Sequence, residues 1–233
     1  MSIVKIDKDF GGANLMIKKR IISCFMLCAL MISSIMGFAI NSNAADVDSV
    51  KSQREDGTYV YYVNTESLLK NAVKSANDGD CILFTHSIIC CDNLNIRRNI
   101  TIDFNIHSLS FAGAFAYRGL VINSNTTLKN GSVYGATNAS SAVEAHGDIR
   151  LQNMCIFGGD RNSNWGGNGG NGSGIWITRH HIKIYMDNCR IKGGHGYEKS
   201  EQTGKAIYCS FYFKNYKIIS EGKGYIAVDG IYK

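Results

Sequence analysis

Short segments of alternating apolar and polar residues fill most of the chain from residue 81 onward. Four of them share the order apolar residue, variable residue, asparagine, two variable residues, β-branched apolar residue: LKNGSV at Leu128, LQNMCI at Leu151, MDNCRI at Met186 and FKNYKI at Phe213. A period of two is typical of β-strands that bury one face. The pattern predicts a single continuous core that contains Ile149, Leu151, Ile156, Ile184, Met186, Ile191, Phe211, Phe213 and Ile218.

One earlier segment has the period of a helix. After Thr65, which is a suitable N-cap, apolar residues recur at helical spacing in SLLKNAVKSA, beginning at Ser67. Short strand signals follow at residues 81, 87, 94 and 100, each bounded by Asn, Asp, Gly or Ser. We therefore expect one short helix followed by many short strands.

The shared asparagines recur at a spacing typical of a solenoid. Asn130, Asn153, Asn188 and Asn215 are 23, 35 and 27 residues apart, and Ile106 takes the place of the asparagine one repeat earlier. A period in the twenties indicates stacked coils that bury their apolar faces against one another. Since each asparagine shares the inward face, we expect the four amides to form a structural ladder at a turn. The longer spacings predict loop insertions, the first of them Gly/Asn-rich at 158–174.

The N-terminal region has the features of an export signal. Residues 16–44 have a basic start, a long apolar run and small residues at the end, as in a cleaved signal peptide. An uncleaved membrane anchor is the alternative, because residues 21–40 are long enough to span a bilayer. We expect a secreted or cell-surface protein in which residues 1–15 are a mis-assigned start or an extension, 45–57 a linker and 58–233 the folded domain.

The composition excludes several classes of protein. The 233 residues are 45% hydrophobic, with 25 glycines and no proline, which excludes a disordered chain and favours tight, repeated turns. Residues 45–233 are nearly neutral and have no Lys/Arg cluster, so we expect no nucleic-acid partner. Buried free thiols are expected more than disulfides, which export would permit, at Cys81, Cys90, Cys91, Cys155, Cys189 and Cys209.

The chain resembles the right-handed parallel β-helix proteins of the pectin-lyase-like superfamily, in their exported bacterial surface form. The resemblance rests on the asparagine column and on SLLKNAVKSANDGDCILFTHSI followed by LNIRRNITIDFNIHSLSF, and it covers residues 58–220. It implies an all-β fold, a right-handed parallel β-helix of about five or six rungs with a short N-terminal capping helix. The family includes lyases, hydrolases, tailspikes and adhesins, so the resemblance implies carbohydrate-facing or surface-binding work without fixing an activity.

Outward residues of the stacked strands form columns across the coils. One column contains Arg150, Tyr185 and Tyr212, a cationic and aromatic strip that suits sugar binding; stabilisation of the sheet is the alternative. Trp165, in the Gly/Asn-rich loop, is a further candidate for sugar stacking. That loop offers calcium a single carboxylate, Asp160, whereas calcium sites usually contain more than one, so we expect no metal site and no cofactor.

The carboxylates of the columns do not form a catalytic pair. We expect Asp148 to pair with Lys183 and Asp187 with Lys214, as surface ion pairs. The two aspartates would lie about 14 Å apart at the strand rise, whereas a glycosidase needs roughly 5 to 10 Å. Glu144 projects from a different strand. No catalytic residue is therefore assigned.

These patterns favour a secreted or cell-surface protein that binds glycans or a partner without catalysis. The alternatives are a polysaccharide lyase or glycoside hydrolase, with acidic residues that converge beneath the 158–174 loop, and a fragment of a longer surface or tailspike protein. The expected partners are a polysaccharide or cell-surface glycan, a membrane only through the signal segment, and a further copy at the uncapped C-terminal coil.

Overall fold

The computed structural model describes residues 50–137, 141–160, 172–194, 204–209 and 215–230, without the side chains of 113–117. Residues 47–233 form one compact unit. The predicted signal segment, residues 16–44, lies outside the described residues. In the part of the chain that is described, no helix has the length and apolar character needed to span a membrane.

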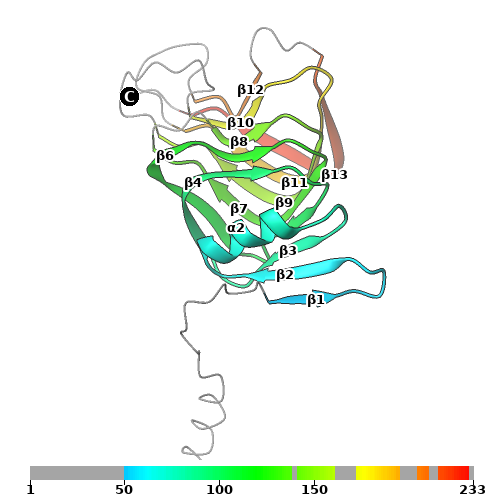
Figure 1. The fold of residues 1–233 in the computed structure, drawn as a ribbon. Helices are drawn as coiled ribbons and strands as arrows, with labels where there is room; N and C mark the ends of the chain where they lie inside the picture. Colours follow the sequence, from blue (N-terminus) through cyan, green and yellow to red (C-terminus); the bar gives the residue numbers. More distant parts are fainter. Residues whose placement is uncertain (1–49, 138–140, 161–171, 195–203, 210–214, 231–233) are drawn as a thin grey trace, which may run out of the picture. The chain divides into compact units, whose positions relative to one another are not determined.

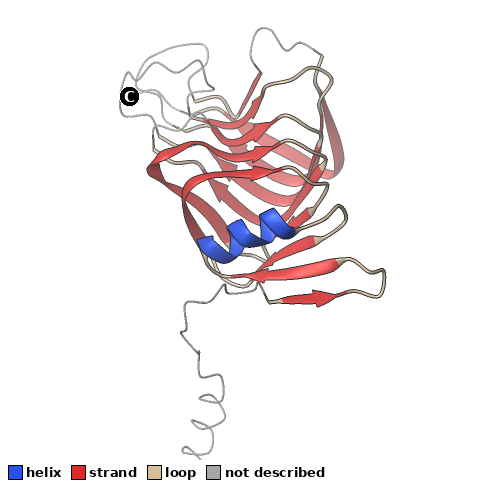
Figure 2. Ribbon diagram, in the orientation of Figure 1, coloured by secondary structure: helices blue, strands red, loops and turns tan. Residues whose placement is uncertain are grey.

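The described residues form an all-β fold with thirteen strands and one helix (Figures 1 and 2). Every strand pair is parallel except β1 with β2. In chain order the elements are β1 (Lys51–Gln53), β2 (Tyr59–Val63), α2 (Glu66–Ser75), β3 (Cys81–Phe84), β4 (Ile88–Ile96), β5 (Thr101–Asp103), β6 (Ser108–Ile122), β7 (Thr126–Tyr134), β8 (Ser141–Ala145), β9 (Ile149–Phe157), β10 (Ser173–Ile177), β11 (Lys183–Lys192), β12 (Ile207–Cys209) and β13 (Lys217–Val228).

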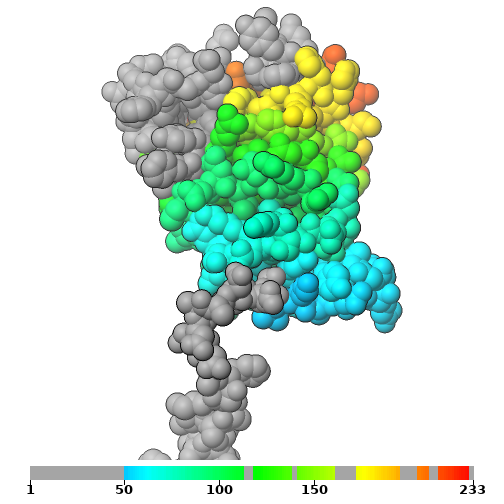
Figure 3. Space-filling model, in the orientation of Figure 1, coloured from blue at the N-terminus to red at the C-terminus, as the bar shows by residue number. Residues whose placement is uncertain are grey.

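The strands pair in three parallel stacks, because the longer strands bend and contribute to two stacks each. The first face contains β2, β3, β5 and the first halves of β7, β9, β11 and β13. The second face contains the second halves of those four strands and the first parts of β4 and β6. The third face contains the ends of β4 and β6 with β8, β10 and β12. Successive segments lie in layers, as the sequence colours of Figure 3 show.

The inward residues form one core between the faces. Leu151 and Met186 are paired neighbours on β9 and β11, and both are fully buried. Each such side chain stabilises the fold by about 1.5–3 kcal/mol relative to an exposed one. Ile149, Ile156, Ile184 and Ile191 are buried as predicted, and Ile218 is half-buried. Phe211 and Phe213 lie outside the described residues.

Three asparagines turn the chain at equivalent positions of three neighbouring parallel strands, β7, β9 and β11. The φ angles of Asn130, Asn153 and Asn188 are +59°, +52° and +51°, a left-handed conformation that asparagine tolerates better than most residues. A residue in this conformation interrupts the strand alternation. Asn153 and Asn188 are exposed and Asn130 is half-buried, so the expectation of inward amides is wrong.

The amides of these asparagines are hydrogen-bonded in series along the surface. Asn188 Nδ2 donates to Asn153 Oδ1 at 2.8 Å, and Asn153 Nδ2 donates to Asn130 Oδ1 at 3.0 Å. Asn130 Nδ2 then donates to Asp103 Oδ1 at 3.1 Å. A carboxylate only accepts hydrogen bonds when ionised, so Asp103, and not the position of Ile106, ends the series.

Asn215 lies at a different corner. The pairing of β11 with β13 places Glu221 opposite Asp187, so Gly222, with φ +48°, follows at the position that Asn188 occupies one coil earlier. Asn215 precedes β13 altogether. The predicted alignment of Asn215 with Asn188 is therefore wrong in register.

Glycines at the end of the second face allow close approach between coils. A Cβ on Gly159 would overlap the carbonyl oxygen of Ala136, and one on Gly194 would overlap the carbonyl oxygen of Gly159. The preceding glycines, Gly135, Gly158 and Gly193, follow three of the four repeated segments two positions on, and a Cβ on each of them would also overlap backbone. No side chain fits there without moving backbone.

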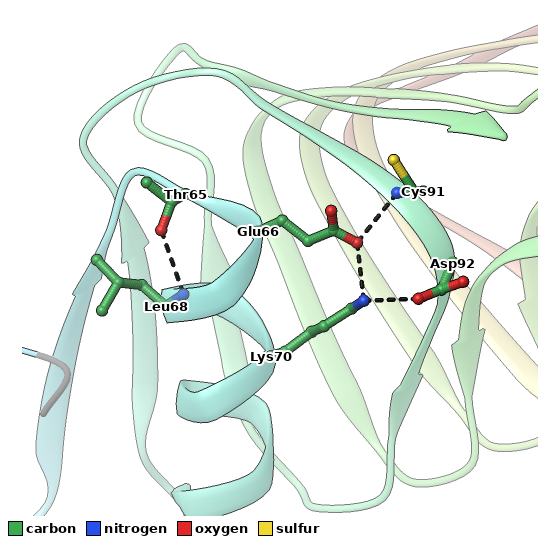
Figure 4. Close-up of polar contacts among 6 residues, drawn as sticks. All are labelled: Thr65, Glu66, Leu68, Lys70, Cys91 and Asp92. Atoms are coloured by element: carbon green, nitrogen blue, oxygen red, sulfur yellow. Dashed lines mark hydrogen bonds and ion pairs between the residues drawn. The ribbon is translucent and has the colours of Figure 1, made fainter. Parts of the chain in front are cut away.

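Helix α2 covers the edge of β4. Thr65 is its N-cap, and Thr65 Oγ1 accepts from the Leu68 N–H at 3.3 Å (Figure 4). Glu66 accepts from Lys70 Nζ at 2.8 Å and from the Cys91 N–H of β4 at 3.0 Å. Lys70 also pairs with Asp92 of β4, at 2.8 Å. These contacts hold the helix beside β4.

Candidate functional site

The predicted strip on the first face is present in part. Arg150 and Tyr185 are paired neighbours on β9 and β11, and the guanidinium carbon lies 4.6 Å from the centroid of the Tyr185 ring. The next residue in the column is Ile219 and not Tyr212. Tyr212 and Trp165 lie outside the described residues.

The Arg150 and Tyr185 side chains are occupied with each other and with Glu221. Arg150 Nη1 forms an ion pair with Glu221 Oε2 of β13. Because the guanidinium lies over the Tyr185 ring and its charge is neutralised, this cluster stabilises neighbouring strands. Arg150 covers one face of the Tyr185 ring, so that face is not available to a sugar.

The two aspartates of the first face bind backbone. Asp148 Oδ1 accepts from the Lys183 N–H and Asp187 Oδ1 from the Lys223 N–H, each at 2.8 Å. Asp187 lies beside Glu221, because Glu221 is its partner in register; its predicted neighbour Lys214 is outside the described residues. Both aspartates therefore bind the backbone of the neighbouring strand. The predicted ion pair of Asp148 with Lys183 is replaced by a backbone contact, whereas that of Asp187 with Lys214 lies partly outside the described residues.

A second polar cluster lies on the third face, around Glu144. Glu144 points away from the core between Val143 and Ala145, which are fully buried, yet it is itself only 1% exposed. Glu144 Oε1 lies 2.5 Å from His146 Nε2 and 3.5 Å from Arg118 Nη1. His146 is two residues further along, so it projects from the same side of the chain.

Trp176 and Tyr208 continue the same outward column. Strand pairing places Trp176 of β10 directly beside Glu144 of β8, and Tyr208 of β12 beside Trp176. Both aromatic side chains are half-buried. Burial raises the pKa of the Tyr208 phenol, so the hydroxyl stays protonated and can donate a hydrogen bond.

Two polar atoms in this cluster are buried without a hydrogen-bond partner among the described residues. They are Glu144 Oε2 and Trp176 Nε1. The first accepts a hydrogen bond and the second donates one. Leaving such a group unpaired costs about 1–3 kcal/mol. We refer to Arg118, Glu144, His146, Trp176 and Tyr208 as the Glu144 cluster.

Sequence reasoning missed the Glu144 cluster because its members come from four strands. The sequence pattern places Glu144 on a different strand from the other carboxylates. The cluster forms around that strand, β8. The available signal was the charge itself, since SAVEAH from Ser141 puts a glutamate inside a small apolar strand. Charged residues are rarely fully buried unless paired.

The chemistry of the cluster suits recognition of a ligand with several hydrogen-bonding groups. It combines an acceptor, an indole donor, a phenol, an imidazole and a guanidinium. It contains a single carboxylate, whereas a glycosidase uses two. Among the described residues, no three His, Cys, Asp or Glu side chains are grouped as metal ligands.

Comparison with known proteins yields no relative. No family model, curated protein or solved structure matches the chain. The fold defines the class of the protein as all-β, with stacked and largely parallel strands.

Proposed function

We propose that this protein is an exported right-handed parallel β-helix that binds a carbohydrate at the Glu144 cluster without cleaving it. The observation that carries the proposal is the pair of unpartnered buried atoms, Glu144 Oε2 and Trp176 Nε1, on adjacent positions of β8 and β10. A sugar hydroxyl donates and accepts at once, so one hydroxyl group can pair with both atoms.

The aromatic column supports a sugar as the ligand. Trp176 and Tyr208 are consecutive in the column and half-buried, and such rings offer apolar surface to a pyranose while their polar ends bind hydroxyls. Arg118 is the most open member of the cluster, with its side chain 53% exposed. Its exposed positive charge favours a sugar that carries an acidic group.

The proposed solenoid and its export rest on separate observations. The three parallel stacks and the asparagine series support a β-helix, and connections between parallel strands are right-handed in nearly all proteins. Residues 16–44 support export through their basic, apolar and small-residue order.

A polysaccharide lyase is the second candidate. The observation that favours it is the 2.5 Å contact between His146 Nε2 and Glu144 Oε1, with Arg118 beside them. A carboxylate can orient an imidazole as a base, and a guanidinium can neutralise the acid group of a uronate. A lyase of this kind would release unsaturated sugar products.

One experiment separates the two candidates. The full chain is screened on a glycan array, and each glycan that binds is incubated with the protein and assayed for unsaturated products by ultraviolet absorbance. Binding without product, abolished in Glu144→Gln, supports the proposed function. Product formation that is lost in His146→Gln supports the lyase. Absence of binding across the array contradicts both.

A further inference from the structure

Strand β13 has an open edge. It pairs with β11 along one side, and within the described residues no strand pairs with its other side. Its twelve residues are mostly exposed, including Ile226 at 63%, Val228 at 41% and Tyr225 at 37%. Long apolar edges are templates for pairing with another chain.

Among the described residues, no further strand covers the core-facing residues of β13. Ile218 is paired in register with Ile184, and Ala227 with Ile191. The two β11 residues are fully buried. Ile218 is half-buried and Ala227 exposed. The apolar interior of the stack thus continues to this edge, where none of the described strands covers it.

The opposite edge of the sheet is built differently. It is formed by β1, a three-residue strand of sequence KSQ, which is exposed throughout and antiparallel to β2. Short, polar, charged strands are the usual protection of an edge. Because the β1 edge is not complementary to β13, a head-to-tail arrangement of copies does not fit.

We propose that β13 is the dimer interface, and that a second copy of this chain docks on it about a two-fold axis through the Gly222–Gly224 corner. Both glycines have positive φ, +48° and +71°, and the strand turns there from the first face to the second. The axis sets residues 217–220 of one copy antiparallel to residues 225–228 of the other. Interfaces with two-fold symmetry use the same patch on both subunits.

The alternation of β13 fits this pairing. If inward residues face inward residues, Ile218 lies opposite the partner's Ala227 and Ile219 opposite the partner's Ile226. Each contact occurs twice by symmetry. The pairing satisfies the free backbone groups of the edge and covers the open core, which a polar partner surface would not do.

The mass of the full chain in solution tests the proposal, by sedimentation velocity across a concentration series. The wild type is expected to dimerise, and Ile226→Lys to raise the dimer dissociation constant at least tenfold. Ile89→Lys is the matched control, because Ile89 on β4 is exposed to the same degree, 62%, and lies far from β13 in the strand order. It should leave the dimer unchanged. Circular dichroism confirms that each variant is folded.

Hydrogen exchange locates the interface. Amides of β13 should exchange more slowly in the dimer and lose this protection on dilution, while β1 amides stay unchanged. A monomer at all concentrations overturns the proposal. A mass unaffected by Ile226→Lys, oligomers larger than the dimer, or protection at β1 would overturn it equally.

Discussion

Glu144 and Trp176 occupy paired positions on β8 and β10, and each carries a buried polar atom with no hydrogen-bond partner in the part of the chain that the structure describes. The carboxylate oxygen and the indole N–H project from adjacent strands of one face. Each unpaired atom lowers the free energy of unfolding by an amount that is a noticeable part of the small net stability of a domain. A protein that keeps both is more simply understood if a ligand pairs with them.

The asparagine series stabilises the corner of the first and second faces. Asn153→Ala removes two side-chain hydrogen bonds and puts alanine at φ +52°, so the free energy of unfolding should fall by about 1–3 kcal/mol. Urea denaturation measures this change. Asn153→Gly keeps the left-handed conformation without strain and should lose only the hydrogen-bond part. A wild-type stability for Asn153→Ala would show that the series contributes nothing.

Gly159, which follows β9, tests the close packing of backbone at the end of the second face. Gly159→Ala should lower the free energy of unfolding by about 3 kcal/mol or more, because the new methyl group overlaps the Ala136 carbonyl. Gly57→Ala in the β1–β2 turn is the control. No atom lies within 4 Å of a Cβ there, and φ is +84°, so only the conformational cost of about 1–2 kcal/mol applies. Equal losses at the two sites would contradict the proposed steric contact.

The contact between helix α2 and β4 predicts a pH dependence. The hydrogen bond from Lys70 lowers the pKa of Glu66, and the Cys91 N–H adds to this effect. A lowered folded pKa means that the stabilisation is present above the unfolded value of about 4.3 and is lost as the pH falls through the folded value.

Glu66→Gln should therefore destabilise the protein at neutral pH and have little effect at an acidic pH below the folded pKa of Glu66. The pair is partly exposed, so the loss at neutral pH is expected to be about 0.5–1 kcal/mol. Thermal or urea unfolding at both pH values provides the measurement, with Glu55→Gln in the β1–β2 turn as the control. The same loss at both pH values would mean that the ion pair is not its cause.

Local patterns were sufficient to predict most strands and the helix. The period of two located the strands around Leu128, Leu151 and Met186, and Thr65 marked the start of α2 as its N-cap. These features depend on residues close in sequence, which is why they can be read without a structure.

The errors concern relationships between coils. FKNYKI matched the repeated pattern, but asparagine adopts the left-handed conformation at more than one corner, so the pattern alone assigned Asn215 to the wrong one. The prediction that the Asn153 side chain faces inward was wrong, because the alternation of inward and outward side chains stops at a residue with left-handed backbone. The Glu144 cluster needs the register of four strands on the third face, and no local period contains that information.

Calorimetric titration of Trp176→Phe tests carbohydrate binding at the Glu144 cluster most directly. The titrant is the oligosaccharide that binds most tightly on the array, and Tyr185→Phe on the first face is the control. Phenylalanine keeps an aromatic ring and removes the indole N–H, so the dissociation constant should rise about three- to tenfold, the equivalent of one hydrogen bond, while the control stays at the wild-type value. An unchanged dissociation constant for Trp176→Phe, or a loss of binding in Tyr185→Phe instead, would contradict the assignment of the site to the third face.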